Sequence, residues 1–187
     1  MSIPPIVSFV GKSNSGKTTL LEKVIRELKR RGYRVGTIKH DAHDFEMDRP
    51  GTDTWRHAQA GSDHVLISSP HKVASIRRVE QEMPLLELAA QMPDVDIILT
   101  EGYKRGPAPK IEVSRRERST SLICSPAELI AVVSDQHFDL PIPQYGLDDA
   151  VGVADLIEER FLMPLPHAGL ASAVTAPVTN RDPDHRR

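Results

Sequence analysis

Apolar residues along the chain alternate between short continuous runs and stretches with helical spacing. Residues 6–10 form an apolar run of the kind expected of a strand buried on both faces. A turn with two glycines follows. The next apolar residues recur at helical spacing, and they are Leu20, Leu21, Val24, Ile25 and Leu28. Gly32 stands where a glycine commonly ends a helix, so the pattern predicts a strand, a turn and a helix.

The same alternation continues to residue 161. Further strands are predicted at residues 34–39, 95–100, 110–113 and 129–134, and further helices at 52–60, 84–92 and 148–161. Pro84 is expected at the first position of its helix, and Asp148 as the N-cap of the last one. Two apolar runs, 65–67 and 73–76, flank a Ser-Pro-His-Lys turn and predict a β-hairpin. Strands that alternate with helices predict an α/β fold, in which helices cover both faces of a mostly parallel sheet and the hairpin is an insertion.

Composition narrows the class of protein. The chain is 39% hydrophobic and 27% charged with a formal net charge of -2, so no basic excess favours nucleic acid or an anionic membrane. No apolar stretch approaches the roughly 20 residues that span a bilayer. Cys124 is the single cysteine, which fits a reducing compartment. We therefore expect a cytoplasmic protein with one domain over residues 1–163, followed by a disordered, proline-containing tail over 164–187.

The turn after the first strand carries the most specific motif. Residues 11–18 read Gly-Lys-Ser-Asn-Ser-Gly-Lys-Thr and fit the P-loop pattern. The glycines let successive backbone N–H groups converge on phosphate oxygens, and the following helix adds its N-terminal dipole. Lys17 supplies a cation for the β- and γ-phosphates, and the Thr18 hydroxyl is a ligand for Mg²⁺. The residues predicted to hold the nucleotide are Gly11, Ser13, Asn14, Ser15, Gly16, Lys17, Thr18 and Thr19.

A P-loop nucleotide-binding fold also needs an acid at the end of a second strand to hold the magnesium shell. Glu101 follows the strand predicted at 95–100 and is the leading candidate as both a magnesium-side and a catalytic group; Asp96 is the alternative. Asp41, just after the strand at 34–39, is the candidate for positioning magnesium or water. The loop at residues 39–48, rich in Asp and His, has two alternative interpretations. It could be a solvated run of charges, or it could bind a transition metal, although its spacing matches no specific zinc pattern.

The base-binding residue is harder to place. The Asn-Lys-x-Asp guanine signature is absent, because Asn14 and Asn180 are the only asparagines. Asp135 ends a late strand, where it could accept hydrogen bonds from guanine N1 and N2; the alternative is an aspartate of a turn.

Taken together, these motifs resemble the molybdopterin-guanine dinucleotide biosynthesis protein B (MobB) family. The resemblance covers residues 3–161. Its specific parts are the P-loop, Thr-Ile-Lys-His at 37–40, residues 48–54, Ala-Gly at 60–61, Glu-Gly-Tyr-Lys at 101–104, residues 109–113 and Ser-Asp at 134–135. Two features depart from the family: Thr52 stands where lysine is common, and the tail has no clear counterpart.

The resemblance implies a small dimeric protein that binds GTP and Mg²⁺ with weak GTPase activity. Such a protein acts as an adapter for MobA, the guanylyltransferase that joins GMP to molybdopterin in molybdenum cofactor biosynthesis, and for molybdopterin or molybdoenzymes. The exposed edge expected of the hairpin at 65–76 also favours a homodimer.

Two other functions are compatible with the residues. A P-loop small-molecule kinase would need a pocket for its acceptor. A phosphorylated acceptor or the pterin phosphate could be bound by the basic residues Lys104, Arg105, Lys110, Arg115 and Arg116. A nucleotide-dependent metal-insertion chaperone would depend on His40 and His43.

Overall fold

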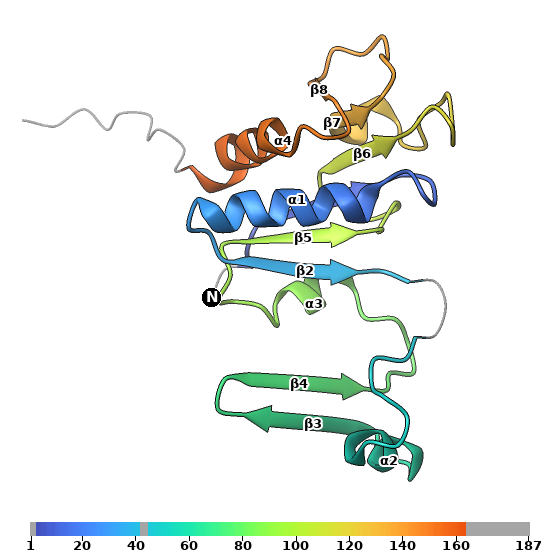
Figure 1. The fold of residues 1–187 in the computed structure, drawn as a ribbon, viewed down its shortest axis with the longest axis vertical. Helices are drawn as coiled ribbons and strands as arrows, with labels where there is room; N and C mark the ends of the chain where they lie inside the picture. The colour runs from blue at the N-terminus through green and yellow to red at the C-terminus, as the bar shows by residue number, and fades with distance from the viewer. Residues whose placement is uncertain (1–2, 42–44, 164–187) are drawn as a thin grey trace, which may run out of the picture.

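A six-stranded parallel sheet forms the centre of the protein in the computed structural model, which describes residues 3–41 and 45–163 (Figure 1). The strands are β1 (Ile6–Val10), β2 (Val35–Lys39), β5 (Ile97–Glu101), β6 (Lys110–Ser114), β7 (Leu129–Ser134) and β8 (Gln144–Tyr145). Their order in space is β2-β5-β1-β6-β7-β8, and all neighbours run parallel. Because β1 lies inside the sheet, the turn that follows it is flanked by the ends of β5 and β6.

Helices cover both faces of this sheet, as the alternating pattern predicted. One face packs against α1 (Lys17–Arg30) and α4 (Ala150–Ile157), which continues into a π-helical turn at Glu158–Leu162. The other face is covered by the short helix α3 (Leu85–Ala89), visible below the sheet in Figure 1. Alternate side chains of β1 point to opposite faces of the sheet: Val7 and Phe9 pack on the side of α1, and Ile6 packs on the side of α3. The α/β class expected from the sequence is therefore confirmed.

Helix α1 begins and ends where the sequence predicted. Its buried stripe consists of Leu20, Leu21, Val24 and Leu28. Gly16 precedes the helix with a φ of 99°, and Gly32 follows its end with a φ of 95°. The N–H of Tyr33 donates to the Leu28 carbonyl across that end at 3.1 Å, so Gly32 supplies the left-handed residue of the helix terminus.

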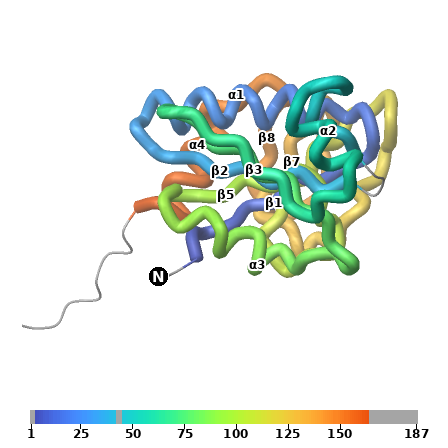
Figure 2. The backbone as a smooth tube through the Cα atoms, turned by 90° about the horizontal axis from the view of Figure 1, so that it is seen from below, coloured from blue at the N-terminus to red at the C-terminus, as the bar shows by residue number. Residues whose placement is uncertain are grey.

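The predicted hairpin is also present, and it forms a small unit outside the main sheet. Strands β3 (His64–Ser69) and β4 (Lys72–Arg77) pair antiparallel with each other, and helix α2 (Asp53–Gln59) packs on β3. Thr52 is the N-cap of α2 and accepts a hydrogen bond from the Trp55 N–H. Seen from below, α2 and β3 lie in front of the sheet (Figure 2).

Several local predictions about the ends of helices are wrong. The N-cap of α4 is Asp149, not Asp148, because the Asp149 carboxylate accepts the Gly152 N–H at 2.9 Å while Asp148 pairs with Lys23 at 2.6 Å. Pro84 is the N-cap of α3 and not its first helical residue. That helix ends at Ala89, three residues earlier than expected.

Two further differences concern the strands. Strand β8 was not predicted, because two residues are too short to show a period. Asp96 lies just before β5 and not within it, and its carboxylate accepts the N–H of Arg34 at 2.6 Å. The predictions for His43 and for the tail at 164–187 fall outside the described residues. No helix in the described ranges is long and apolar enough to cross a bilayer.

Candidate functional site

A pocket of about 520 Å³ opens at the carboxyl end of β1. Its lining residues are Ser13, Asn14, Gly16, Lys17, Thr18, Thr19, Glu101 and Arg115. Most of them come from the P-loop and the first turn of α1, where free backbone N–H groups and the helix dipole favour an anion. Glu101 enters from the end of β5 and Arg115 from the end of β6, so three adjacent strands contribute to one site.

Two of the residues predicted to hold the nucleotide, Gly11 and Ser15, are buried and do not line the pocket. Gly11 is buried with a φ of +147°, and a Cβ there would stand 2.3 Å from the carbonyl oxygen of Val113. Ser15 is also buried, and its hydroxyl has no hydrogen-bond partner among the described residues. Gly11 therefore lets the loop pass against β6, and the Ser15 side chain points into the protein.

The Thr18 hydroxyl and the Glu101 carboxylate meet in the pocket. Thr18 Oγ1 donates to both carboxylate oxygens of Glu101, at 2.9 and 3.0 Å. A hydroxyl and a carboxylate are oxygen donors of the hard type that Mg²⁺ prefers, and their proximity at the start of α1 fits a magnesium site beside bound phosphates. The residues present therefore suit the metal that a P-loop requires.

Lys17 lies half-buried between this pair and the loop. Burial lowers the pKa of Lys17, the Glu101 charge opposes that shift, and Lys104 and Lys39 reinforce it. The Lys17 ammonium donates to the carbonyl oxygen of Lys12 at 2.8 Å. The cation is thus held over the P-loop, within reach of the same space as Thr18 and Glu101.

The other acids of the sequence-based site do not line this pocket. Asp41 is exposed beyond the end of β2. Asp135 is exposed beyond β7, and one of its carboxylate oxygens accepts the Arg116 N–H at 2.7 Å. Their roles in water positioning and in base recognition stay predictions.

The basic residues after β5 and β6 do not form one surface. Lys110 is 3% exposed, and its ammonium donates to the Gly106 carbonyl at 2.8 Å and to Glu128 at 2.9 Å, so it belongs to the core. Arg115 instead lines the phosphate pocket. The sequence-based prediction gave Arg115 a role toward a phosphorylated acceptor or the pterin phosphate. Its place directly after a strand next to β1 could have indicated the P-loop.

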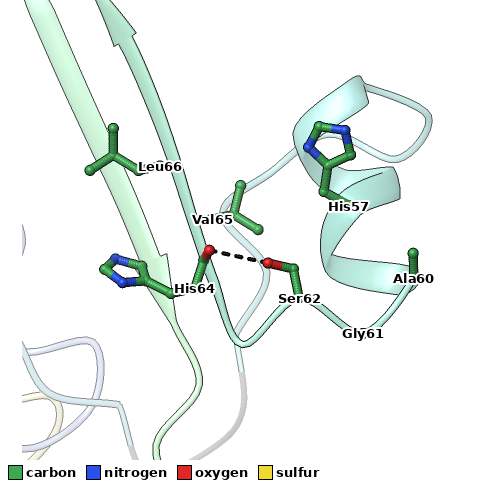
Figure 3. Close-up of a pocket in the computed structure, with 7 residues that line it drawn as sticks. All are labelled: His57, Ala60, Gly61, Ser62, His64, Val65 and Leu66. Atoms are coloured by element: carbon green, nitrogen blue, oxygen red, sulfur yellow. Dashed lines mark hydrogen bonds between the residues drawn. The ribbon is translucent and has the colours of Figure 1, made fainter.

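A second hollow of about 600 Å³ lies between α2 and β3 (Figure 3). It is lined by His57, Ala60, Gly61, Ser62, His64, Val65 and Leu66. The rings of His57 and His64 project on different sides of Val65 and do not converge (Figure 3). No group of three or more His, Cys, Asp or Glu residues in the described ranges could hold a metal ion.

Comparison with known proteins identifies the family of the chain. The family model described as "Molybdopterin guanine dinucleotide synthesis protein B" (MobB) matches residues 6–135, which include the P-loop, Glu101 and Arg115. The chain belongs to the MobB family. The resemblance noted in the sequence is therefore confirmed.

Individual relatives match this chain over most of its length. The molybdopterin-guanine dinucleotide biosynthesis adapter protein of Haemophilus influenzae is 35% identical over 82% of this chain and 88% of its own. The Escherichia coli protein of the same name is 35% identical over 83% and 92%. The crystal structure of Bacillus subtilis MobB, 28% identical, superimposes with a TM-score of 0.69 and covers 84% of this chain and 98% of that one. Family membership favours the adapter role over a kinase or a metal-insertion chaperone.

Proposed function

We propose that this protein is a GTP-binding adapter in the synthesis of molybdopterin guanine dinucleotide. The observation that carries the proposal is a complete P-loop pocket in a chain of the MobB family. The named relatives are adapter proteins of this pathway. Among the described residues, Glu101 is the one acid that lines the pocket, which supports binding of the nucleotide better than rapid turnover. We therefore expect a weak GTPase activity at most.

We assign separate steps of binding to the lining residues and to two acids outside the pocket, Asp41 and Asp135. Backbone N–H groups at the start of α1 and the Lys17 ammonium meet the β- and γ-phosphates. Thr18 and Glu101 hold Mg²⁺, which neutralises phosphate charge when bound. Asp135 reads the guanine base beyond β7, and Asp41 positions water or magnesium at the end of β2.

The magnesium assignment predicts a specific loss. Thr18→Ala and Glu101→Gln should each weaken GTP binding about tenfold in the presence of Mg²⁺, because each removes one charge-assisted ligand interaction. Without the metal, the same variants should differ far less from the native protein. Isothermal titration with and without EDTA measures both quantities. Asp96→Asn is the matched control, since Asp96 directly precedes the same strand but pairs with Arg34. Equal losses with and without Mg²⁺ would show that the two residues support only the loop.

The adapter role requires a partner, and the partner expected is a MobA-type guanylyltransferase, with molybdopterin or a molybdoenzyme as the other candidate. A pulldown from cell extract, with and without GTP, tests this directly. Recovery of the guanylyltransferase by the native protein and its reduction with Lys17→Ala would support a nucleotide-dependent adapter. Recovery of neither class of partner in either condition would count against the pathway assignment.

We further propose a homodimer formed through the hairpin. Leu66, Ile67, Val73 and Ile76 are 58%, 54%, 63% and 38% exposed, a large amount of apolar surface for a two-stranded sheet. Each strand of the hairpin also has one edge that no other described strand covers. Apolar side chains and an open edge favour pairing with another chain, and a two-fold arrangement closes the assembly at two copies.

A charge on this surface should separate the copies. Ile67→Asp should raise the dimer dissociation constant at least about tenfold, because two like charges would meet near a symmetric interface. Val151→Asp is the matched control: Val151 is 55% exposed, similar to Ile67, but lies on α4 across the sheet from the hairpin. Light scattering over a range of micromolar concentrations measures the state. A native chain that is monomeric under all nucleotide conditions would defeat the homodimer, and equal effects of both variants would move the interface elsewhere.

A further inference from the structure

Arg115 occupies a position in the phosphate pocket that the P-loop motif does not include. It is the first residue after β6, which pairs directly with β1. One terminal nitrogen of its guanidinium lies 3.6 Å from where a Cβ on Gly16 would stand. Gly16 is the N-cap of α1, so this cation faces the turn where the free backbone N–H groups gather. No ion pair of Arg115 occurs within the described part of the chain, whereas the nearby Asp148 is paired with Lys23.

Arg115 begins the segment 115–124, which follows β6. The end of this segment farther from Arg115 is held by a buried carboxylate. Glu112 on β6 is 1% exposed. Its two oxygens accept the N–H groups of Ile123 and Cys124 at 2.7 and 3.0 Å. A buried carboxylate that accepts two backbone donors holds its loop firmly, because loss of either bond would leave a charged or polar group unsatisfied.

The near end of the segment is anchored as well. The Arg116 N–H donates to Asp135, and the N–H groups of Arg118 and Ser119 return to the Arg115 carbonyl at 2.8 and 3.0 Å. The Gln136 amide donates to the Ser119 carbonyl at 2.7 Å. Residues on β6 and directly after β7 therefore fix the backbone of the segment. The backbone at Arg115 is held in place before a ligand binds, which reduces the entropy lost on binding.

The order of the strands shows which end of a nucleotide Arg115 faces. Glu101 on β5 and Thr18 mark the side on which magnesium would bridge the β- and γ-phosphates. Since β1 lies between β5 and β6, Arg115 stands on the opposite side of the P-loop from Glu101. We take the phosphates of the nucleotide to lie along the start of α1, with the magnesium end beside β5. In that orientation the α-phosphate and the nucleoside lie on the side of β6 and β7.

We propose that Arg115 binds the α-phosphate of the nucleotide and fixes the end of the phosphate chain that lies away from magnesium. The inference rests on the proposed GTP-binding function and deepens it. The guanidinium presents parallel N–H donors that match two phosphate oxygens. Because GTP and GDP share the α-phosphate, Arg115 supports the binding of both and plays no part in telling them apart.

The experiment compares Arg115→Ala with Arg116→Ala. Arg116 carries the same charge one residue later, but its side chain does not line the pocket. Arg115→Ala should weaken GTP–Mg²⁺ and GDP–Mg²⁺ about tenfold each and leave the ratio of the two affinities unchanged. Arg116→Ala should leave both affinities near the native values. Isothermal titration measures the affinities, and urea denaturation verifies that the two variants fold equally well.

The outcomes separate this inference from the function on which it rests. Native affinities in a folded Arg115→Ala protein would overturn it, and so would a loss confined to GTP, which would place the guanidinium at the γ-phosphate. If the native protein binds nucleotide in a way that requires Lys17 but not Arg115, the inference fails alone. If the native protein binds neither GTP nor GDP, the proposed function fails and the inference with it.

Discussion

Lys17→Ala is expected to reduce the affinity for GTP–Mg²⁺ more than any other single substitution in the pocket. Charge-assisted contacts contribute about 1.5–3 kcal/mol each, and a lysine between two phosphates makes more than one, so the loss should exceed about tenfold. The fold should survive, because the ammonium lies half-buried at the pocket and, among the described residues, hydrogen-bonds to the Lys12 carbonyl. Isothermal titration gives the affinity, and thermal unfolding gives the stability.

Lys12→Ala is the control for that result. Lys12 carries the same charge on the same loop, but its side chain is exposed and does not line the pocket. Its carbonyl, which accepts the Lys17 ammonium, remains in the variant. We expect Lys12→Ala to bind GTP–Mg²⁺ nearly as the native protein does. Equal affinities for the native protein and a folded Lys17→Ala variant would mean that this loop is not the phosphate site.

Gly11→Ala should have the largest effect on stability. The added Cβ would stand 2.3 Å from the Val113 carbonyl oxygen, and the backbone φ of +147° is a conformation that alanine rarely adopts. The added Cβ and the Val113 carbonyl oxygen are both fixed to the backbone, so the loop or β6 must move to relieve the contact. Strain and overpacking together should lower the free energy of unfolding by about 2–4 kcal/mol. Urea denaturation measures it.

Gly32→Ala separates the two causes. Gly32 also has a positive φ, +95°, but a Cβ there meets nothing within 4 Å. Its cost should be about 1 kcal/mol, since only the backbone conformation is disfavoured. If the two variants lose the same stability, the close approach of Gly11 to Val113 does not constrain the loop.

Much of the site follows from the sequence, because a parallel sheet brings the carboxyl ends of its strands to one edge. Residues 11–18 lie between an apolar run and a helical period, and Glu101 follows a second apolar run. These local patterns suffice to predict that Thr18 and Glu101 lie close together, and their oxygens are 2.9 and 3.0 Å apart. The helix from the P-loop to Gly32 was predicted for the same reason, since its period and its terminating glycine are both local.

The rest depends on contacts between distant segments. The apolar residues of β6 do not reveal that Glu112 between them is buried and binds the backbone of residues 123 and 124. A basic run likewise does not distinguish Lys110, enclosed with Glu128, from Arg115, which faces the P-loop. The order of the strands determines both the burial of Glu112 and the different surroundings of Lys110 and Arg115. It is set by the packing of the whole sheet, which no local period encodes.

The placement of α2, β3 and β4 also has a consequence for how the protein opens and folds. The three elements lie between β2 and β5 in the chain, yet those two strands are direct neighbours in the sheet. Hairpin and helix pack chiefly on each other, so they form a cooperative unit that can unfold locally while the β2–β5 ladder stays intact. Sequence changes within this unit should alter the equilibrium of its own local unfolding. The hydrogen-exchange protection of the strands that carry the P-loop pocket should be largely unaffected, so the two parts of the chain can vary independently.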